Sequence, residues 1–155
     1  MPLTISEINI YVLKTPHESR PHWVSHFIVP NANEVMVKLK TNDGITGFGL
    51  ATSYTDVSPT VKVFETGLAD QVLGMSPLSP EQIYKKLFNL TATRIASEKG
   101  WNREALIRIS AAIDIACWDI MGKVANLPLY QLFGGYRDKV PCYVTCAYYR
   151  NGKGL

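Results

Sequence analysis

The sequence has no long hydrophobic run and no marked excess of one charge. No apolar stretch approaches the roughly 20 residues that a membrane-spanning helix requires. The formal net charge is +3, with acidic and basic residues interspersed, and this weak balance argues against nucleic acid or a membrane surface as a partner. The first residues lack the basic and long apolar regions of a secretory signal, so we expect a cytoplasmic protein.

Cysteine is scarce, and its spacing does not suit metal binding. The three cysteines are Cys117, Cys142 and Cys146. The last two would lie roughly 13 Å apart on one strand, which exceeds the roughly 7 Å that a disulfide can span. The sequence also lacks the Cys-x-x-Cys pairs and Cys/His clusters that bind zinc. We therefore expect buried thiols in a reducing compartment.

Internal repeats and low-complexity segments are also absent. The 155 residues are 46% hydrophobic and 19% charged, which is typical of a globular domain with its own core. Strand patterns fill the first third, helical patterns the middle, and one more strand pattern comes last. This order predicts an α+β fold with something further starting after it.

The first third predicts a three-stranded antiparallel meander. Residues 5–13 alternate, with their aliphatic side chains through Val12 on the core face, and residues 34–40 alternate again. A Thr-Asn-Asp-Gly turn at 41–44 leads into a third strand at 46–50, because these turn residues tolerate positive φ.

Residues 15–33 separate the first two predicted strands. They contain three prolines and all three histidines of the chain. We expect a long loop here, with a short extended piece at 23–29.

The middle of the chain changes to helical spacing. Residues 58–72 predict one helix that begins with a Ser58-Pro59 cap. A capping box at 79–82 predicts a second helix. Asn102 is expected to cap a third helix, which runs to about Ala125 and is apolar on nearly all sides. That helix should be central and buried.

The last part predicts a short helical turn at 129–133, stopped by Gly134 and Gly135, and then a strand at 139–147.

Residues 110–123 and 128–135 are the most informative stretch. Small residues in its helix permit close approach by a neighbouring backbone. Asp114 and Asp119 lie in otherwise apolar surroundings, where a carboxylate must be paired or hydrogen-bonded. They point some 140° apart on a helix, so we interpret them as structural rather than as a catalytic pair.

This stretch closely resembles the signature of the mandelate racemase and muconate lactonizing group of the enolase superfamily. The family pattern is small-small-aliphatic-Asp-x-Ala-x-Trp-Asp-x-x-Gly-Lys, then Pro-aliphatic-x-x-Leu-x-Gly-Gly, and the chain follows it with fixed spacing. Cys117 departs from it, since the family usually has leucine or alanine there. The resemblance covers essentially the whole chain and argues against an unrelated ligand-binding module.

The resemblance implies a capping, substrate-specificity domain at 1–135 and the start of a (β/α)₈-like barrel at 136–155. Family members remove the proton α to a carboxylate with the help of Mg²⁺. Their metal ligands and catalytic residues lie on later barrel strands, which this sequence does not contain. We therefore expect no catalytic residue, no metal ligand and no activity in this chain alone, and we interpret Lys153 as a surface lysine.

The resemblance also implies that two loops of the capping domain select the substrate. They correspond to residues 15–33 and 51–56. The candidate substrate-binding residues are His17, Arg20, His22, Trp23 and Tyr54. Arginine and histidine suit a carboxylate or a polyhydroxylated acid, and tryptophan supplies an apolar lid. For any single residue, an ordinary solvated loop position is an equally good interpretation.

The activity most consistent with this polar first loop is acid-sugar dehydration or racemisation. A muconate-type cycloisomerase is the alternative activity, although it would be expected to have a more apolar lid. A truncated homologue that only binds or assembles is the alternative from another class. The expected partners are a small carboxylate such as an acid sugar, the chain's own missing barrel domain and, in the complete protein, further copies of itself.

Overall fold

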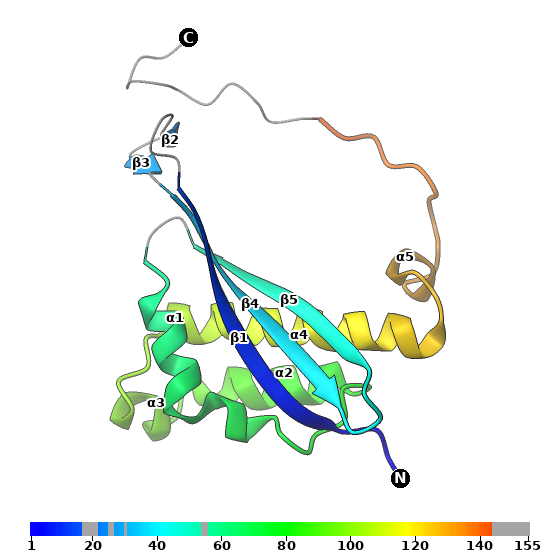
Figure 1. Cartoon of the computed structure of the whole chain (residues 1–155), viewed down its shortest axis with the longest axis horizontal. Helices are drawn as coiled ribbons and strands as arrows, with labels where there is room; N and C mark the ends of the chain where they lie inside the picture. Colours follow the sequence, from blue (N-terminus) through cyan, green and yellow to red (C-terminus); the bar gives the residue numbers. More distant parts are fainter. Residues whose placement is uncertain (17–21, 25–26, 30, 54–55, 144–155) are drawn as a thin grey trace.

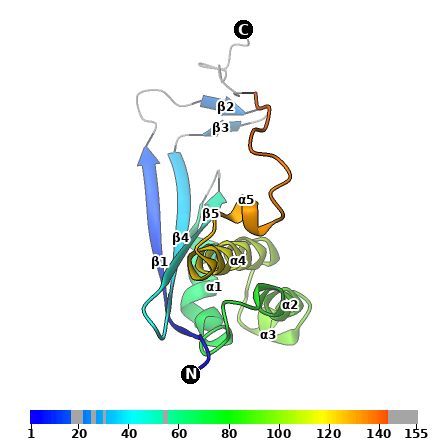
Figure 2. The same ribbon diagram turned by 90° about the vertical axis from the view of Figure 1, so that its right-hand side faces the viewer.

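The computed structural model describes residues 1–16, 22–24, 27–29, 31–53 and 56–143. Three strands, β1 (Ile5–Pro16), β4 (Asn31–Thr41) and β5 (Thr46–Ser53), form an antiparallel sheet in the order β1-β4-β5. Helices cover one face of this sheet (Figures 1 and 2). The predicted meander and the α+β class are confirmed.

The alternating apolar side chains of the strands point into the core as predicted, but not at every position. Val35, Val37 and Leu39 of β4 are fully buried. Val12 of β1 is 53% exposed, so its predicted place in the core is wrong. Val12 pairs with the buried Val35, but it lies on the edge strand β1, whereas the long helix at 103–125 packs against β5 and β4.

The predicted loop at 15–33 is shorter than expected. β1 and β4 remain paired as far as Pro16 and Asn31, and a separate small hairpin consists of β2 (His22–Val24) and β3 (Phe27–Val29). Backbone pairing needs no buried face, so the strands extend where the hydrophobic alternation has ended. The expected extended piece at 23–29 contains β3 and most of β2.

The first predicted helix is broken. It consists of α1 (Ser58–Val63), a π-helical turn η1 (Phe64–Leu68) and a 3₁₀ turn η2 (Ala69–Gln71). Gly67 has φ of +112°, a left-handed conformation that an α-helix cannot contain. Trp101 Nε1 holds this kink by donating to Thr66 Oγ1 at 2.6 Å.

Two predicted caps are wrong in detail. Ser58 is the first residue of α1 rather than its cap, and the Asp56 carboxylate accepts from both its N–H and its hydroxyl. Ser79 precedes α2 (Pro80–Leu90), but its side chain makes no capping hydrogen bond. Its ψ of 59° lies outside the extended region in which a cap side chain reaches the first turn.

The third predicted helix, α4 (Arg103–Ala125), runs through the centre of the domain. Asn102 caps it as predicted, because its side-chain oxygen accepts from the N–H groups of Glu104 and Ala105. The sheet and α2 bury one side of the helix, whereas Ile107 and Ile115 on the other side are 41% and 48% exposed. The helix is therefore central, but it is not enclosed all round by the described residues. The five-residue α3 (Arg94–Glu98), which the sequence pattern did not indicate, lies between α2 and α4 in the chain.

The chain then turns back through α5 (Leu129–Leu132), whose following residue Phe133 packs edge-on against Trp118 at 4.8 Å between ring centroids. Gly134 and Gly135 have φ of +103° and +59°, as a glycine stop requires. Residues 139–143 form no strand, and residues 144–155, including Lys153, lie outside the described residues. The predicted strand is therefore absent at 139–143, and at 144–147 it stays a prediction.

Candidate functional site

Helix α4 covers the open edge of β5. Because β5 is an edge strand, alternate residues point their backbone N–H and C=O groups away from β4. Side chains of α4 bind three of these residues. Lys123 Nζ donates to the Thr46 carbonyl at 2.8 Å, and the Asp119 carboxylate accepts from the Phe48 N–H at 2.9 Å. Arg108 donates to the Thr52 carbonyl.

This edge contact requires that strand and helix lie very close together. A Cβ atom added at Gly47 would lie 2.2 Å from the Ala116 carbonyl oxygen, and one at Gly49 would lie 2.0 Å from that of Ala112. Both glycines are needed because they have no side chain, and the two alanines present the least bulk from the helix. The predicted close approach of a backbone to this helix is confirmed, and the approaching backbone is β5.

Asp119 has a structural role within the domain. Besides the Phe48 N–H, its carboxylate binds Lys123 Nζ at 2.7 Å, and the same ammonium group lies 5.4 Å from the centre of the Phe48 ring. Asp119 therefore ties α4 to β5, as the requirement for a paired carboxylate predicts.

Asp114 behaves differently. It is half-buried, and within the described part of the chain its carboxylate has no hydrogen-bond or ion-pair partner. Burial, and to a lesser degree the charge of Glu81, raises the pKa of this carboxyl. Among the described residues the expected partner is therefore present for Asp119 but not for Asp114, whose structural role stays a prediction. Burial, followed by the Asp114 charge, also raises the pKa of the neighbouring Cys117 thiol to about 12.

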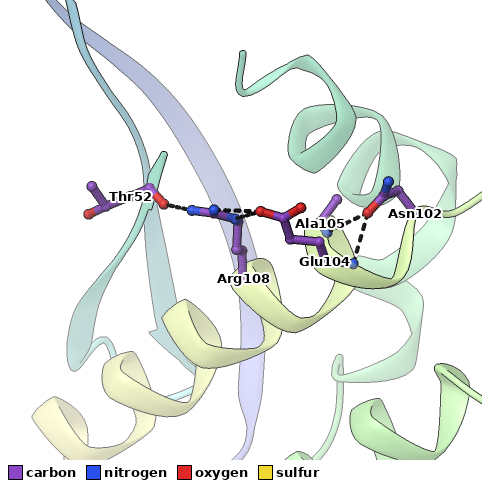
Figure 3. Close-up of polar contacts among 5 residues, drawn as sticks. All are labelled: Thr52, Asn102, Glu104, Ala105 and Arg108. Carbon is purple, nitrogen blue, oxygen red and sulfur yellow. Dashed lines mark hydrogen bonds and ion pairs between the residues drawn. The ribbon is translucent and has the colours of Figure 1, made fainter. Parts of the chain in front are cut away.

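Arg108 forms the centre of a polar network at the start of α4 (Figure 3). Its Nε and Nη2 donate to the Glu104 carboxylate at 3.1 and 2.6 Å, while Nη1 donates to the Thr52 carbonyl. The Arg108 side chain is 32% exposed and that of Glu104 is 70% exposed. A shallow pocket beside the network is lined by Asp56, Pro59, Thr60, Asn102, Glu104, Ala105 and Arg108.

The network lies at the end of the sheet from which both predicted substrate loops leave. Thr52 is the penultimate residue of β5, next to the second loop. Pro16 and Asn31, at the same end of the sheet, bracket most of the first loop (Figure 1). The structure thus brings the bases of the two loops together at one end of the domain.

The side chains of all five predicted substrate-binding residues lie outside the part of the chain that the structure describes. His17, Arg20 and Tyr54 lie outside the described residues. His22 and Trp23 belong to β2 and pair with Val29 and Ile28, but the structure describes only their backbone. Their roles stay predictions.

Arg108 and Glu104 form the polar network at the start of α4, and the sequence interpretation did not name either of them. The only signal is their spacing of four residues on a helix, which normally marks an ordinary surface ion pair. The contact with Thr52, 56 residues away in the chain, is a tertiary one.

The described residues do not offer a metal site or a membrane-spanning helix. Among them, no three His, Cys, Asp or Glu side chains gather where they could hold a metal ion. None of the helices in the described ranges combines the length and apolarity needed to cross a bilayer.

Comparison with known proteins places the chain among related enzymes. The family described as "Mandelate racemase / muconate lactonizing enzyme, N-terminal domain" matches residues 7–134. The N-succinyl-L-Arg/Lys racemase of Bacillus cereus is 30% identical over 90% of this chain and 36% of its own length. A D-galactonate dehydratase family member of Enterococcus gallinarum is 40% identical over 72% of this chain and 27% of its own length.

A solved structure agrees with this comparison. The L-talarate/galactarate dehydratase of Salmonella typhimurium LT2, liganded with Mg and L-lyxarohydroxamate, superposes with a TM-score of 0.75 and is 25% identical. The match covers 92% of this chain and 36% of that one. The chain therefore spans roughly a third of the length of these relatives.

Proposed function

Because the chain belongs to the mandelate racemase and muconate lactonizing enzyme family through its N-terminal domain, we propose that it is the capping part of an enzyme that removes the proton α to a carboxylate. In this proposal residues 1–135 form the substrate-selecting domain, and residues 136–155 begin a (β/α)₈-like barrel that carries the chemistry. The reaction is the dehydration or racemisation of a small acid, with an acid sugar as the preferred substrate class.

The observation that carries this proposal is the position of the two loop bases. Residues 17–30 and 54–55 both connect to the sheet at the end where Thr52 is held by Arg108. The side chains proposed to meet the substrate are His17, Arg20, His22, Trp23 and Tyr54. A cationic arginine and neutral or protonated histidines can donate hydrogen bonds to a carboxylate and to the hydroxyl groups of a sugar acid.

Magnesium belongs to the proposal only as a cofactor of the complete enzyme. The Salmonella typhimurium relative is liganded with Mg. The described residues of this chain do not fit a metal ion, because they bring no three suitable ligands together. Residues beyond them would have to hold it, and the role that we propose for this chain is to enclose and select the substrate.

The direct test begins with the gene. The reading frame that contains this sequence should encode a barrel with a Lys-x-Lys strand and later acidic ligands. Its purified product should dehydrate or racemise acid sugars when Mg²⁺ is present and lose that activity with a chelator. A frame that ends at Leu155 and yields a stable protein would instead support the non-catalytic binding or assembly homologue.

A second candidate reaction is the racemisation of an N-acylated amino acid. It is favoured by the Bacillus cereus racemase, whose match covers 90% of this chain. Assaying acid sugars and N-succinyl amino acids side by side distinguishes the two reactions. With the 155-residue chain alone, calorimetric titration with Mg²⁺ and acid sugars should give no heat of specific binding. Specific binding would contradict the assignment of the chemistry to the barrel.

We further propose that the complete protein is a homo-oligomer. Four large side chains share the face of the sheet opposite the helices and are 40–44% exposed: Tyr11, Leu13, Phe48 and Leu50. Such a grouped apolar face favours association. Light scattering of the chain should therefore detect self-association, whereas a monomer at all concentrations would contradict the proposal.

A further inference from the structure

The three α4 side chains that bind the edge of β5 divide into two groups. Asp119 and Lys123 bind Phe48 and Thr46, near the turn that leads into β5. Arg108 binds the opposite end of the strand. It precedes Asp119 by eleven residues, about 16 Å along a helix, which is similar to the roughly 13 Å between Phe48 and Thr52 on the strand. The helix thus fastens both ends of β5.

The orientation of Arg108 is set by Glu104. A guanidinium group is planar, and the two bonds to one carboxylate oxygen, from Nε and Nη2, restrict that plane. The third contact, from Nη1, then points to the Thr52 carbonyl. Glu104 itself lies in the capped first turn of α4, where its own N–H donates to Asn102 at 2.8 Å. The capped first turn of α4 therefore positions Glu104, Glu104 orients the Arg108 guanidinium, and the guanidinium then points to the Thr52 carbonyl.

Residues 54–55 are bounded by fixed points on both sides. On one side, the Thr52 carbonyl is held by Arg108, and the Thr52 hydroxyl also lies 3.4 Å from the Glu34 carboxylate on β4. On the other side, the Asp56 carboxylate accepts from the Ser58 N–H at 2.9 Å and from its hydroxyl at 2.7 Å. Asp56 and Arg108 line the same shallow pocket.

We propose that Arg108, oriented by Glu104, is a positioning residue that fixes the Thr52 carbonyl and thereby the point from which the second substrate loop leaves the sheet. The inference rests on the proposed function, because residues 51–56 affect specificity only if they form that loop. Arg108 acts through the strand and does not itself contact the substrate.

The first experiment compares amide hydrogen exchange in the 155-residue chain and in its Arg108→Met variant. The variant keeps an unbranched side chain but removes all three hydrogen bonds. Amides of residues 51–53 and 56–58 should exchange about tenfold faster. The free energy of local opening is lower in the variant, because the charge-assisted hydrogen bond from Arg108 to Thr52 is already absent. Exchange in the helical core, at residues 109–120, should stay within about twofold of the unmodified chain.

The matched control is Lys123→Met, which removes the anchor at the other end of the same strand edge. Its exchange should rise around Thr46 and stay unchanged at residues 51–53. Arg108→Lys should restore part of the protection, because one donor can still reach Thr52. Faster exchange at both ends of β5 in both variants would mean that Arg108 merely stabilises the domain, and this result would overturn the proposal. Unchanged exchange at residues 51–58 in Arg108→Met would overturn it as well.

The second experiment uses the active enzyme expressed from the complete gene. Arg108→Met should raise KM for the acid substrate by roughly tenfold or more, with a smaller change in kcat, because a displaced loop misplaces the groups that hold the substrate. Lys123→Met should leave KM unchanged. An unchanged KM in Arg108→Met would overturn the link between Arg108 and substrate binding. If the unmodified enzyme had no activity on any acid tested, the proposed function would fail, and the exchange comparison would still decide the role of Arg108.

Discussion

Replacing Gly49 with alanine should be among the most damaging small substitutions in this domain. The new Cβ would lie 2.0 Å from the carbonyl oxygen of Ala112 and 3.0 Å from the N atom of Ala116. Both contacts are with the backbone of α4, so no side-chain rotation can relieve them. Real Cβ atoms essentially never approach closer than 3.0 Å, so strand and helix would have to separate by about 1 Å.

The magnitude follows from that displacement. Overpacking of a core typically costs 1–3 kcal/mol when side chains can adjust. Here the rigid backbone must move, and the bond between Asp119 and the Phe48 N–H lengthens with it. We therefore expect a loss of about 3 kcal/mol or more. In a domain of this size that loss corresponds to a fall in Tm of roughly 6–12 °C.

Thermal and urea unfolding followed by circular dichroism measure this effect. The control is Gly44→Ala in the hairpin turn. There the added Cβ meets nothing within 4 Å and only the positive φ of +93° is strained, so the loss should be about 1 kcal/mol. If Gly49→Ala unfolded within about 2 °C of the unmodified chain, the close contact between β5 and α4 would be refuted.

Two further predictions concern the ionisable groups of α4. Cys117 should not react with a thiol reagent at pH 8 in the folded chain, because it is fully buried and its pKa is raised to about 12, whereas the exposed Cys142 should react at once. Peptide mapping distinguishes Cys117 from Cys142 and Cys146, and rapid modification of Cys117 before unfolding would contradict this. Folding raises the pKa of Asp114 above its value in the unfolded chain. The ionised carboxylate therefore lowers the stability of the folded state when the pH exceeds the pKa of the unfolded chain, and it has no such effect below that pKa. Asp114→Asn should accordingly raise Tm at pH 7 but not at pH 3, and a Tm change that is equal at both pH values would show that the titration of Asp114 is not the cause.

The meander could be predicted because one face of the sheet is buried and its hairpin turn has a distinctive sequence. Alternation at residues 34–40 correctly placed the core face, and Gly44 indeed has positive φ. The same rule misplaced Val12, because alternation is informative only where helices cover the sheet. The single helix predicted at 58–72 failed at Gly67, since helical spacing of apolar residues does not reveal a backbone kink.

The candidate site was only partly predictable, for a similar reason. Asp114 and Asp119 lie in the same helix and look alike in sequence, yet only Asp119 meets the exposed backbone of β5. Arg108 binds a backbone carbonyl group, and every residue has one, so the sequence pattern cannot indicate which carbonyl Arg108 contacts. Resemblance to the family predicts two substrate loops, because the signature helix with its fixed spacing marks the family, but it does not predict which residues fix the ends of those loops.

The packing of α4 on β5 also determines when the edge of β5 can be covered during protein synthesis. The groups that satisfy the strand edge lie 56 to 77 residues downstream of their partners. While a ribosome produces the intervening segment, the newly made sheet has an unprotected edge that could pair with another nascent chain. The edge of β5 is therefore covered only after helix α4 has emerged from the ribosome.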